Sequence, residues 1–558
     1  MKSTIDGFQG WLRFRTVVEM AANDDTTILE ETERTTGRAA LRKNVQAAIA
    51  LANTVRSTLG PKGLDKLLLD EEGRVQVTND GVTVLEAARV EHPTARMMIS
   101  SSSTQDRVAR DGTTSTILIA AEMLQNAWDL VAQGVHPVVI ANGYRMAEVE
   151  AQKILELISK ESTDESEILE ATHTSLAGKG HSDIQQRISE LAVQAAASLA
   201  TQENGKTRAD PTLVKILANK GGQANETHLV NGVVIAKKPA HPEMTQSRDA
   251  GKILLVDGGI ERRNTVIDAK IKITEAGMLE AFRNKESEML AKQVDDIIAL
   301  GVDILVCKDG IDDQARSLLE AAGITAYRRV HRNDMEALSR AVGSHPVHST
   351  STANKDDLGH FKSSRQEIWG DVGHWILEGS QKQGLTLVTR GSSEEMLEEV
   401  ERCFADAIGV ACHMHEEART LAGGGATQIA LARRLRRFAE TIPGREQLAI
   451  EAYAEALEVI PRALAENAGQ DALGRLLELT AAQTSADSDW LGLDLESESI
   501  NDMHEAGIRE PIAVTRQAIK GATDSAVSVL RIDDLLWAKQ DPQIPEGVME
   551  QLEGMGGV

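Results

Sequence analysis

The chain has 558 residues, which is too long for one compact core, so we expect two to four domains. Hydrophobic residues make up 41 % and charged residues 26 %, as in ordinary globular proteins, while only 3 % are aromatic, so Ala, Leu, Ile and Val must fill the cores. The net charge of −25 excludes the basic surface that a general nucleic-acid binder needs.

Cysteine spacing and hydropathy both argue against a secreted or membrane protein. Cys307, Cys403 and Cys412 form no CxxC pair, which disfavours a disulfide framework or a zinc ribbon and fits a reducing compartment. No apolar run approaches the roughly 18 residues that a membrane helix needs. Arg13 and Arg15 interrupt the apolar N-terminal residues, so no signal peptide is predicted. We therefore expect a cytoplasmic protein with no nucleic-acid or membrane partner.

The first predicted helix follows a tail, residues 1–35, that we expect to be partly disordered. Apolar residues from Val45 to Leu59 recur at three- and four-residue spacing and form one stripe. Gly60 and Pro61 end this helix, because Gly can take the left-handed cap and Pro cannot continue the helix.

A β-hairpin and a long helix are predicted next. Alternating β-branched residues at 75–78 and 82–84 flank an Asn-Asp-Gly turn at 79–81, which places Asp80 at a hairpin tip. A long helix follows Asp111-Gly112 and runs to about residue 133, where Gly134 stops it.

The middle of the chain has a different pattern. Short apolar strands are predicted at 252–256, 303–307 and 324–330, with a helix at 312–322, and this alternation is typical of α/β architecture. Residues 345–382 have weak periodicity and are predicted to form loops and short edge strands. From about residue 392 to 534 the chain is again helical, so the α/β part is best explained as an insertion between two halves of a helical domain.

One segment before the long helix could carry chemistry. Asp111, Gly112, Thr113, Thr114 and Ser115 offer amides and hydroxyls at a helix N-terminus, which suit an anion, and a carboxylate that could hold Mg²⁺. The same residues are also compatible with a plain helix cap, and by themselves they favour that interpretation. Gly-rich segments at 59–63 and 423–425 are similarly ambiguous.

Other candidates point to ordinary structural roles. Asp80 suits a turn and Asp406 a solvated helix face, and no local spacing pairs them. His413 and His415 lie on different helix faces, which disfavours a metal site. The basic run 433–437 fits a salt-bridged interface better than a nucleic-acid patch. No Walker-type GxxxxGK[ST] motif is present, which disfavours an ordinary P-loop NTPase.

Taken in order, these segments resemble the group II chaperonins, the family of archaeal thermosome and eukaryotic cytosolic chaperonin subunits. The resemblance runs from about Thr35 to Asp534. It is carried by segments that begin at Thr58 (TLGPKGLDK), Thr78 (TNDG), Thr104 (TQD), Asp111 (DGTT), Gly134 (GVHP), Gly310 (GIDD), Gly444 (GREQ), Ala465 (AENAG) and Arg531 (RIDD).

The resemblance implies a multidomain fold with a mainly helical, discontinuous equatorial domain, a small α/β intermediate domain and an inserted α/β apical domain with a helical protrusion. The protrusion resembles the stretch from Ile267–Ile271 through Ser287–Lys292. The implied boundaries are a tail at 1–35, equatorial halves at 36–163 and 422–540, intermediate halves at 164–232 and 387–421, an apical domain at 233–386 and a flexible tail at 541–558.

The same resemblance implies an ATP site. Asp111 matches the Mg²⁺-binding carboxylate, and Asp80 and Asp406 match the carboxylates that position and activate the attacking water. Lys179 resembles a lysine that senses the γ-phosphate, and Glu510 is placed near the ribose. The residues matching the nucleotide-contacting loops are Leu59, Gly60, Pro61, Gly112, Thr113, Thr114, Ser115, Gly424 and Gly425.

Three residues depart from the family pattern: Arg110 stands where Gly is expected, Val108 replaces an acid, and Gln428 replaces a Glu. If position 110 requires a positive φ, Arg there costs roughly 1–2 kcal/mol; its guanidinium could instead contact phosphate. We therefore expect altered, slower ATP turnover.

The function implied is that of an ATP-dependent chaperone, an ATPase that encloses unfolded client proteins in a double ring of identical or paralogous subunits. The lid is built in, so no separate lid protein is expected. The alternative is a divergent, weakly hydrolysing structural subunit of a hetero-oligomeric chaperonin ring.

Overall fold

The computed structural model describes residues 32–538, with gaps at 70–72, 74, 89, 163, 181, 262–275, 382–383 and 487. The predicted tail 541–558 and the stretch Ile267–Ile271 lie outside the described residues. Of the predicted tail 1–35, residues 32–35 are described, and they belong to strand β1 (Thr32–Thr36).

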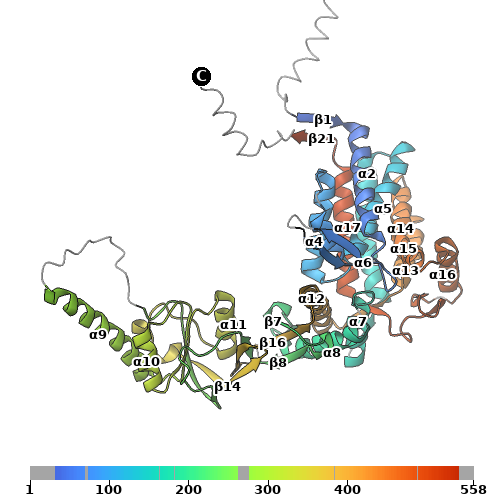
Figure 1. Cartoon of the computed structure of the whole chain (residues 1–558). Coiled ribbons are helices and arrows are strands. Elements are labelled where there is room, and N and C mark those ends of the chain that lie inside the picture. Colours follow the sequence, from blue (N-terminus) through green and yellow to red (C-terminus); the bar gives the residue numbers. More distant parts are fainter. Residues whose placement is uncertain are drawn as a thin grey trace, which may run out of the picture.

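Three main regions of buried residues follow one another in an elongated arrangement, with a helical bundle at one end and an α/β layer at the other (Figure 1). Within the described residues, no helix is both long and apolar enough to cross a membrane.

The largest core joins two distant parts of the chain, since its buried residues come from 41–158 and 421–530. Many of them are alanines, whose small side chains let helices approach closely. Helix α5 lies in the middle and contacts α2, α14 and α17. The helices of this core are α2 (Gly37–Arg56), α4 (Pro93–Ala109), α5 (Thr113–Ala132), α6 (Pro137–Ile158), α13 (Ala426–Ala439), α14 (Glu446–Leu457), α15 (Val459–Asn467), α16 (Ala472–Ala486) and α17 (Ile512–Leu530).

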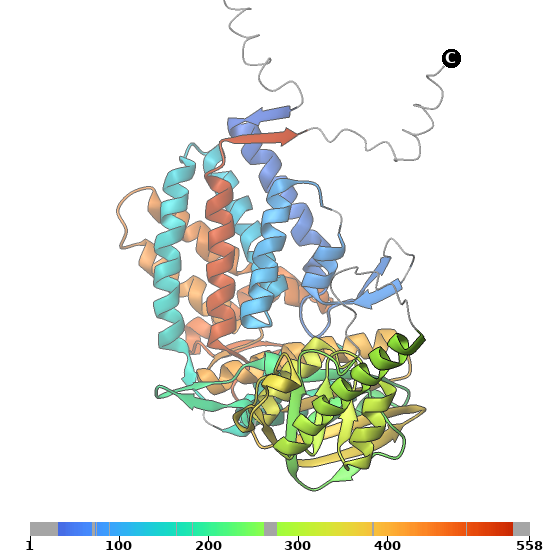
Figure 2. The same cartoon turned by 90° about the vertical axis from the view of Figure 1, so that its left-hand side faces the viewer.

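Short strands surround the helical core. β1 pairs antiparallel with β21 (Asp534–Ala538), and the two lie side by side at one end of the helices (Figure 2). β17 (Arg419–Ala422) lies between β20 (Arg509–Pro511) and β4 (Lys160–Glu161). The remaining pairs are β2 (Lys66–Leu69) with β3 (Val75–Thr78), and β18 (Leu491–Asp494) with β19 (Ser499–Asp502).

A second core contains buried residues from 168–214 and 385–414. Its sheet has β16 in the middle, parallel to β7 and antiparallel to β8. Helices α8 and α12 pack against each other beside this sheet. The elements are α7 (Glu165–Ser175), α8 (Ser182–Leu199), β5 (Thr201–Glu203), β6 (Lys206–Arg208), β7 (Val214–Lys220), β8 (His228–Asn231), β16 (Leu385–Gly391) and α12 (Glu394–Glu416).

The third region is a mixed sheet in the order β13-β12-β11-β14-β15-β9, with β10 beside β14. Along β11, Leu254 faces a core shared with α9 and α10, while Leu255 faces a core shared with α11. Because both faces are covered, the strand reads as a continuous apolar run. The elements are β9 (Val233–Ile235), β10 (Ser247–Arg248), β11 (Gly251–Val256), α9 (Ala276–Leu300), β12 (Ile304–Cys307), α10 (Asp313–Ala321), β13 (Thr325–Tyr327), α11 (Arg332–Val342), β14 (Gly359–Trp369) and β15 (Val372–Gly379).

The predicted hairpin around Asp80 is wrong. Residues 82–84 lie in helix α3 (Gly81–Ala87), and β3 pairs with β2 instead. The Asp80 carboxylate accepts hydrogen bonds from the backbone N–H of Thr83 (2.9 Å) and from its hydroxyl (2.6 Å). This N-cap satisfies free helix donors, and it outweighs the β propensity of the residues that follow.

The prediction of loops and short edge strands for 345–382 is confirmed for 345–358, which form loops and two short 3₁₀ helices, and is wrong for the residues that follow. Strands β14 and β15 are long and lie inside the sheet, between β11 and β9. Much of β14 is exposed or half-buried, which is why its apolar periodicity is weak in the sequence. The predicted helices at 112–133 and 312–322 are confirmed as α5 and α10.

Candidate functional site

One cavity of about 510 Å³ collects residues from both the helical core and the second core. Of the residues that the family resemblance assigned to the ATP site, Asp406 is the one that does not line this cavity; Asp406 instead contacts Lys179, which does. The residues that line it are Leu59, Gly60, Pro61, Asp80, Asp111, Gly112, Thr113, Thr114, Ser115, Lys179, Gly424, Gly425 and Glu510.

Two helices begin at this cavity without a side-chain cap. The residue before α5 is Gly112 (φ 79°) and the residue before α13 is Gly425 (φ 75°); both are left-handed, and neither can supply a capping side chain. The first-turn N–H groups of both helices therefore lack a side-chain acceptor, and the helix dipoles make this end of each helix favourable for negative charge. Two such ends lining one cavity suit a ligand with several anionic groups.

The loop after α2 forms a wall of the cavity and is held from behind by α15. Asn467 donates hydrogen bonds from its amide to the carbonyl oxygens of Leu59 (2.8 Å) and Arg56 (3.0 Å). Gly60 has φ 82°, a conformation that favours glycine. A Cβ on Gly178 would lie 2.5 Å from the Gly60 carbonyl oxygen, so two glycines allow these loops to touch.

Asp80 is placed by its role as the N-cap of α3, and α3 in turn lies against the start of α5. A Cβ on Gly81 would lie 2.5 Å from the Thr114 hydroxyl, so only glycine permits this approach. Asn79 donates from its side chain to the Gly178 carbonyl oxygen at 2.5 Å. The carboxylate of Asp80 is therefore fixed beside the first turn of α5.

A buried cation links two carboxylates at the edge of the cavity. The Nζ of Lys179 lies 2.7 Å from Asp406 Oδ2 and 3.8 Å from Asp111 Oδ1, and the three side chains are between 15 % and 26 % exposed. Burial alone would lower the pKa of Lys179, but the carboxylates of Asp406 and Asp111 outweigh burial and raise that pKa above its usual value. Lys179 is therefore charged at neutral pH.

The pKa of Asp406 is raised to about 7, mainly by burial, with the charges of Asp80 and Asp111 adding to the effect and Lys179 opposing it. Glu510 on β20 also has a pKa raised to about 7 by burial, with a smaller contribution from Asp111. Both carboxyls can therefore exchange a proton near neutral pH, a property typical of groups at functional sites.

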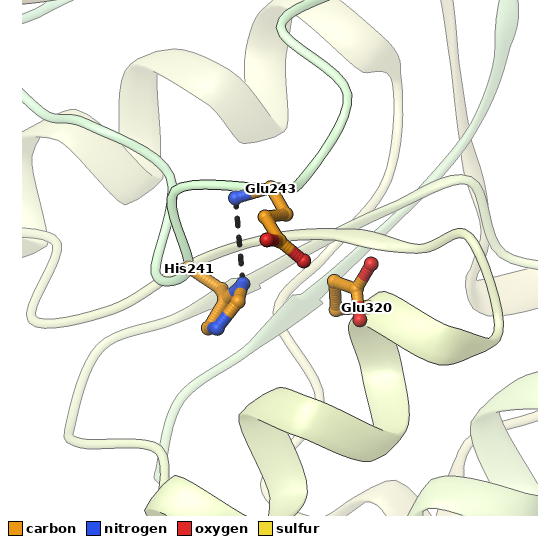
Figure 3. Close-up of side chains that lie close together, drawn as sticks. All are labelled: His241, Glu243 and Glu320. Carbon is orange, nitrogen blue, oxygen red and sulfur yellow. Dashed lines mark hydrogen bonds between the residues drawn. The ribbon is translucent and has the colours of Figure 1, made fainter.

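Asp111 is the residue that could hold a metal in the cavity. Within the described part of the chain it belongs to no compact group of three or more protein ligands, so Mg²⁺ there would complete its coordination with phosphate oxygens and water, its usual ligands in such sites. Among the described residues, the side chains of His241, Glu243 and Glu320 do bring three ligand atoms within 4.8 Å of one another. Two of these residues come from one loop and Glu320 from the end of α10 (Figure 3), in the third region and away from the cavity.

The sequence did not single out Asp494, although it lines the cavity. It is the last residue of β18 and accepts hydrogen bonds from the backbone N–H groups of Glu496 (3.0 Å) and Ser497 (3.2 Å). Burial would raise its pKa, but these bonds and that of the Ser497 hydroxyl outweigh burial and lower the pKa. Locally the residue looks like an ordinary turn former, so no sequence signal distinguishes it.

Arg110, the departure beside Asp111, has φ 58° and ψ 5° and ends helix α4. This left-handed conformation costs a non-glycine residue roughly 1–2 kcal/mol. Arg110 lines a second cavity, of about 730 Å³, rather than the one that contains Asp111. Gln428, another departure, is buried in the cavity that contains Asp111, and its Oε1 has no hydrogen-bond partner among the residues that the structure describes.

Comparison of the whole sequence with known proteins shows the family to which the chain belongs. The profile described as the TCP-1/cpn60 chaperonin family matches residues 51–540. The chain belongs to this chaperonin family. It is 41 % identical over 530 residues to thermosome subunit beta of Methanothermobacter thermautotrophicus, a match that covers 95 % of this chain and 97 % of the relative. Thermosome subunit beta of Archaeoglobus fulgidus is 42 % identical over 514 residues, covering 91 % and 94 %.

Thermosome subunit beta of Thermoplasma acidophilum is 39 % identical over 524 residues, covering 93 % of this chaperonin and 96 % of the relative. Such full-length likeness to archaeal thermosome subunits identifies this chaperonin as a group II subunit, as its ordered motifs implied.

Proposed function

We propose that this chaperonin subunit binds ATP with Mg²⁺ in the 510 Å³ cavity, hydrolyses it, and uses the reaction to drive folding of other proteins inside a ring of subunits. The observation that carries the proposal is the meeting of two uncapped helix N-termini with three carboxylates and a buried lysine. The likeness to thermosome subunits supports it.

The residues present fit a triphosphate. The first-turn amides and hydroxyls of Thr113, Thr114 and Ser115 would hold phosphate oxygens at the start of α5, and the backbone at Gly424 and Gly425 would do so at the start of α13. Asp111 would hold Mg²⁺ against the phosphates, and the metal would neutralise their charge. The Leu59-Gly60-Pro61 wall and Glu510 would contact the nucleoside part.

Hydrolysis would then depend on positioning and on one proton acceptor. Asp406 is suited to take the proton of the attacking water, because its pKa of about 7 lies near the working pH. Asp80, fixed at the N-terminus of α3, would orient that water. Lys179 would hold Asp406 in place and contribute positive charge next to the reacting phosphate.

The three carboxylates of the proposed site come from different cores. Asp80 and Asp111 flank the helical core, whereas Asp406 lies on α12 in the second core. Chemistry would therefore require the two regions to come together, which couples nucleotide state to domain movement. We assign the helical core to an equatorial domain (36–163 and 422–540), the second core to an intermediate domain (164–232 and 387–421) and the mixed sheet to an apical domain (233–386).

The second candidate is a structural subunit that hydrolyses ATP weakly within a mixed ring. The observation that favours it is the left-handed arginine next to Asp111, together with Gln428 in the cavity. The retained arrangement of Asp80, Asp111, Lys179 and Asp406 favours the active ATPase.

The test compares ATP turnover, nucleotide binding and client refolding by assembled wild-type protein with those of Asp406→Ala. Asp371→Ala is a matched control, because Asp371 is exposed at the turn between β14 and β15. We expect wild type and control to hydrolyse ATP and refold a client, and Asp406→Ala to bind nucleotide without either activity. Wild-type assemblies that bind nucleotide but neither hydrolyse it nor refold a client would establish the structural subunit instead.

A further inference from the structure

Helix α12 meets the connection between α4 and α5 at three points along one face. Asp406 reaches it through Lys179, which also lies near Asp111. One turn later, Gly409 faces Arg110. One further turn along, His413 Nε2 lies 2.9 Å from the Val108 carbonyl oxygen, at the end of α4. The spacing 406, 409, 413 keeps all three on the same side of the helix.

In the middle contact, the Arg110 side chain packs directly against Gly409, which has no side chain. A Cβ built on Gly409 would overlap the Cβ and Cγ of Arg110 and lie 3.4 Å from its Cδ. Glycine at 409 therefore provides the space in which the arginine stem sits. Any larger residue there would force α12 away from the α4–α5 turn or force Arg110 to move.

Arg110 has little freedom to move in response. Its left-handed backbone is fixed on one side by the bond from its N–H to the Asp106 carbonyl oxygen (2.8 Å). On the other side, Gln105 donates from its side chain to the Asp111 carbonyl oxygen (2.8 Å). The direction in which the arginine stem leaves the turn is therefore set by the turn itself.

The charge of Arg110 acts on the nearby Asp106, where it opposes the rise in pKa that burial causes. No salt bridge of Arg110 occurs among residues 32–538 as the structure describes them. The steric contact of its stem with Gly409 on α12 is therefore the closest packing that the structure shows for this side chain. The second cavity that it borders is lined by charges of both signs: Arg107, Lys206, Arg208, Asp210, Glu416 and Glu417.

We propose that Arg110 is a positioning residue, whose stem is seated on Gly409 and sets the separation between α12, carrying Asp406, and the turn that carries Asp111. This inference rests on the proposed ATPase site. It pairs Arg110, which stands where the family has glycine, with Gly409 on α12. The two residues are distant in sequence and adjacent in space.

The test is a double-mutant cycle on full-length assemblies, with kcat and KM for ATP measured for Gly409→Ala, Arg110→Gly and the double variant. Gly409→Ala alone should lower kcat about tenfold or more with KM for ATP nearly unchanged, since a displacement of about 1 Å suffices for such losses. The loss cannot come from helix propensity, because Ala favours a helix more than Gly does. Adding Arg110→Gly should restore most of the lost kcat.

Two further variants test whether the rescue is specific to the Arg110 stem. Arg110→Ala retains the Cβ that overlaps position 409, so it should rescue Gly409→Ala less than Arg110→Gly does. Arg107→Gly removes a neighbouring arginine of the same cavity whose atoms are not among the three nearest to a Cβ at 409, and it should not rescue at all. If Gly409→Ala does not assemble, recovery of folded assemblies by Arg110→Gly, and not by Arg107→Gly, gives the same answer.

The inference and the proposed function can fail separately. Wild-type assemblies without ATPase activity would overturn the function, while the cycle can still be read from thermal unfolding midpoints. Unchanged kcat and unchanged unfolding midpoint in Gly409→Ala, or equal rescue by Arg110→Gly and Arg107→Gly, would overturn the assignment of Arg110 as a positioning residue.

Discussion

Replacing Lys179 with Met should move the pH dependence of ATP hydrolysis. In the wild type the Asp406 pKa of about 7 is the result of burial, which raises it, and of Lys179, which lowers it. Below this pKa the carboxylate is protonated and cannot accept a proton, so kcat/KM should fall about tenfold per pH unit on the acid side. Without the Lys179 charge the pKa rises further, and the acid limb moves to higher pH.

The size of the effect follows from burial. The two side chains are 15–18 % exposed and 2.7 Å apart, and breaking such a pair by removing one partner costs about 3–5 kcal/mol. Each pKa unit corresponds to about 1.4 kcal/mol, so an upward shift of one unit or more is expected. At pH 7, where about half of the wild-type carboxylate is ionised, a shift of one unit lowers kcat/KM about fivefold, and the difference from wild type should shrink at higher pH.

The assay is a pH–rate profile of kcat/KM from about pH 5.5 to 9, because this parameter reports groups of the free enzyme. Lys153→Met is the matched control: Lys153 is an exposed residue of α6 paired with Glu150. An acid limb that stays at the same pH in Lys179→Met, or that moves equally in Lys153→Met, would show that the Lys179–Asp406 pair does not set the pKa of the proton acceptor.

Three further outcomes are expected from other parts of the site. The Asp406 pKa is higher in the folded chain than its ordinary value of 3.8, so between these two pKa values the folded state holds a proton that the unfolded state releases. The free energy of unfolding therefore falls as pH rises from about 4 to 7. Asp406→Asn should remove this pH dependence, measured by urea unfolding. Gly425→Ala should destabilise the fold by about 1–2 kcal/mol, because the residue has φ 75° and the new Cβ would lie 2.7 Å from Pro461 Cβ. It should also weaken nucleotide binding. Urea unfolding and nucleotide titration measure the two effects. Thr83→Ala should lower kcat more than Thr83→Ser does, because only Ser keeps the hydroxyl that holds Asp80.

The sequence predicted best where a local pattern decides the structure. Helix α5 has strong apolar content and a Gly-containing stop, and it was placed to within a residue or so. The hairpin around Asp80 failed although its turn signal was strong, because one carboxylate can cap a helix as well as form a turn. Strands β14 and β15 were missed because half-exposed strands carry little apolar periodicity.

The site could not be predicted from local pattern at all. Lys179 and Asp406 are 227 residues apart in sequence, and each looks like an ordinary charged residue in its own segment. Only the order of motifs that resembles the group II chaperonins brought Asp80, Asp111 and Asp406 together. Asp494 belonged to no such motif and was missed, because contacts of this kind are made by the fold rather than by neighbouring residues.

Arg110 shows how a departure from a local rule can be explained by a distant residue. A left-handed arginine beside Asp111, the residue that we propose binds Mg²⁺, looks damaging when only its own segment is considered, since glycine would relieve the strain. Its stem, however, occupies the space left by Gly409 on α12, three residues after Asp406, the carboxylate that we propose takes the proton. If backbone strain at position 110 were the only effect of Arg110, Arg110→Gly alone would accelerate turnover and Gly409→Ala would have no effect. If the two residues act as a pair, each single change alters turnover and the double change largely cancels the loss.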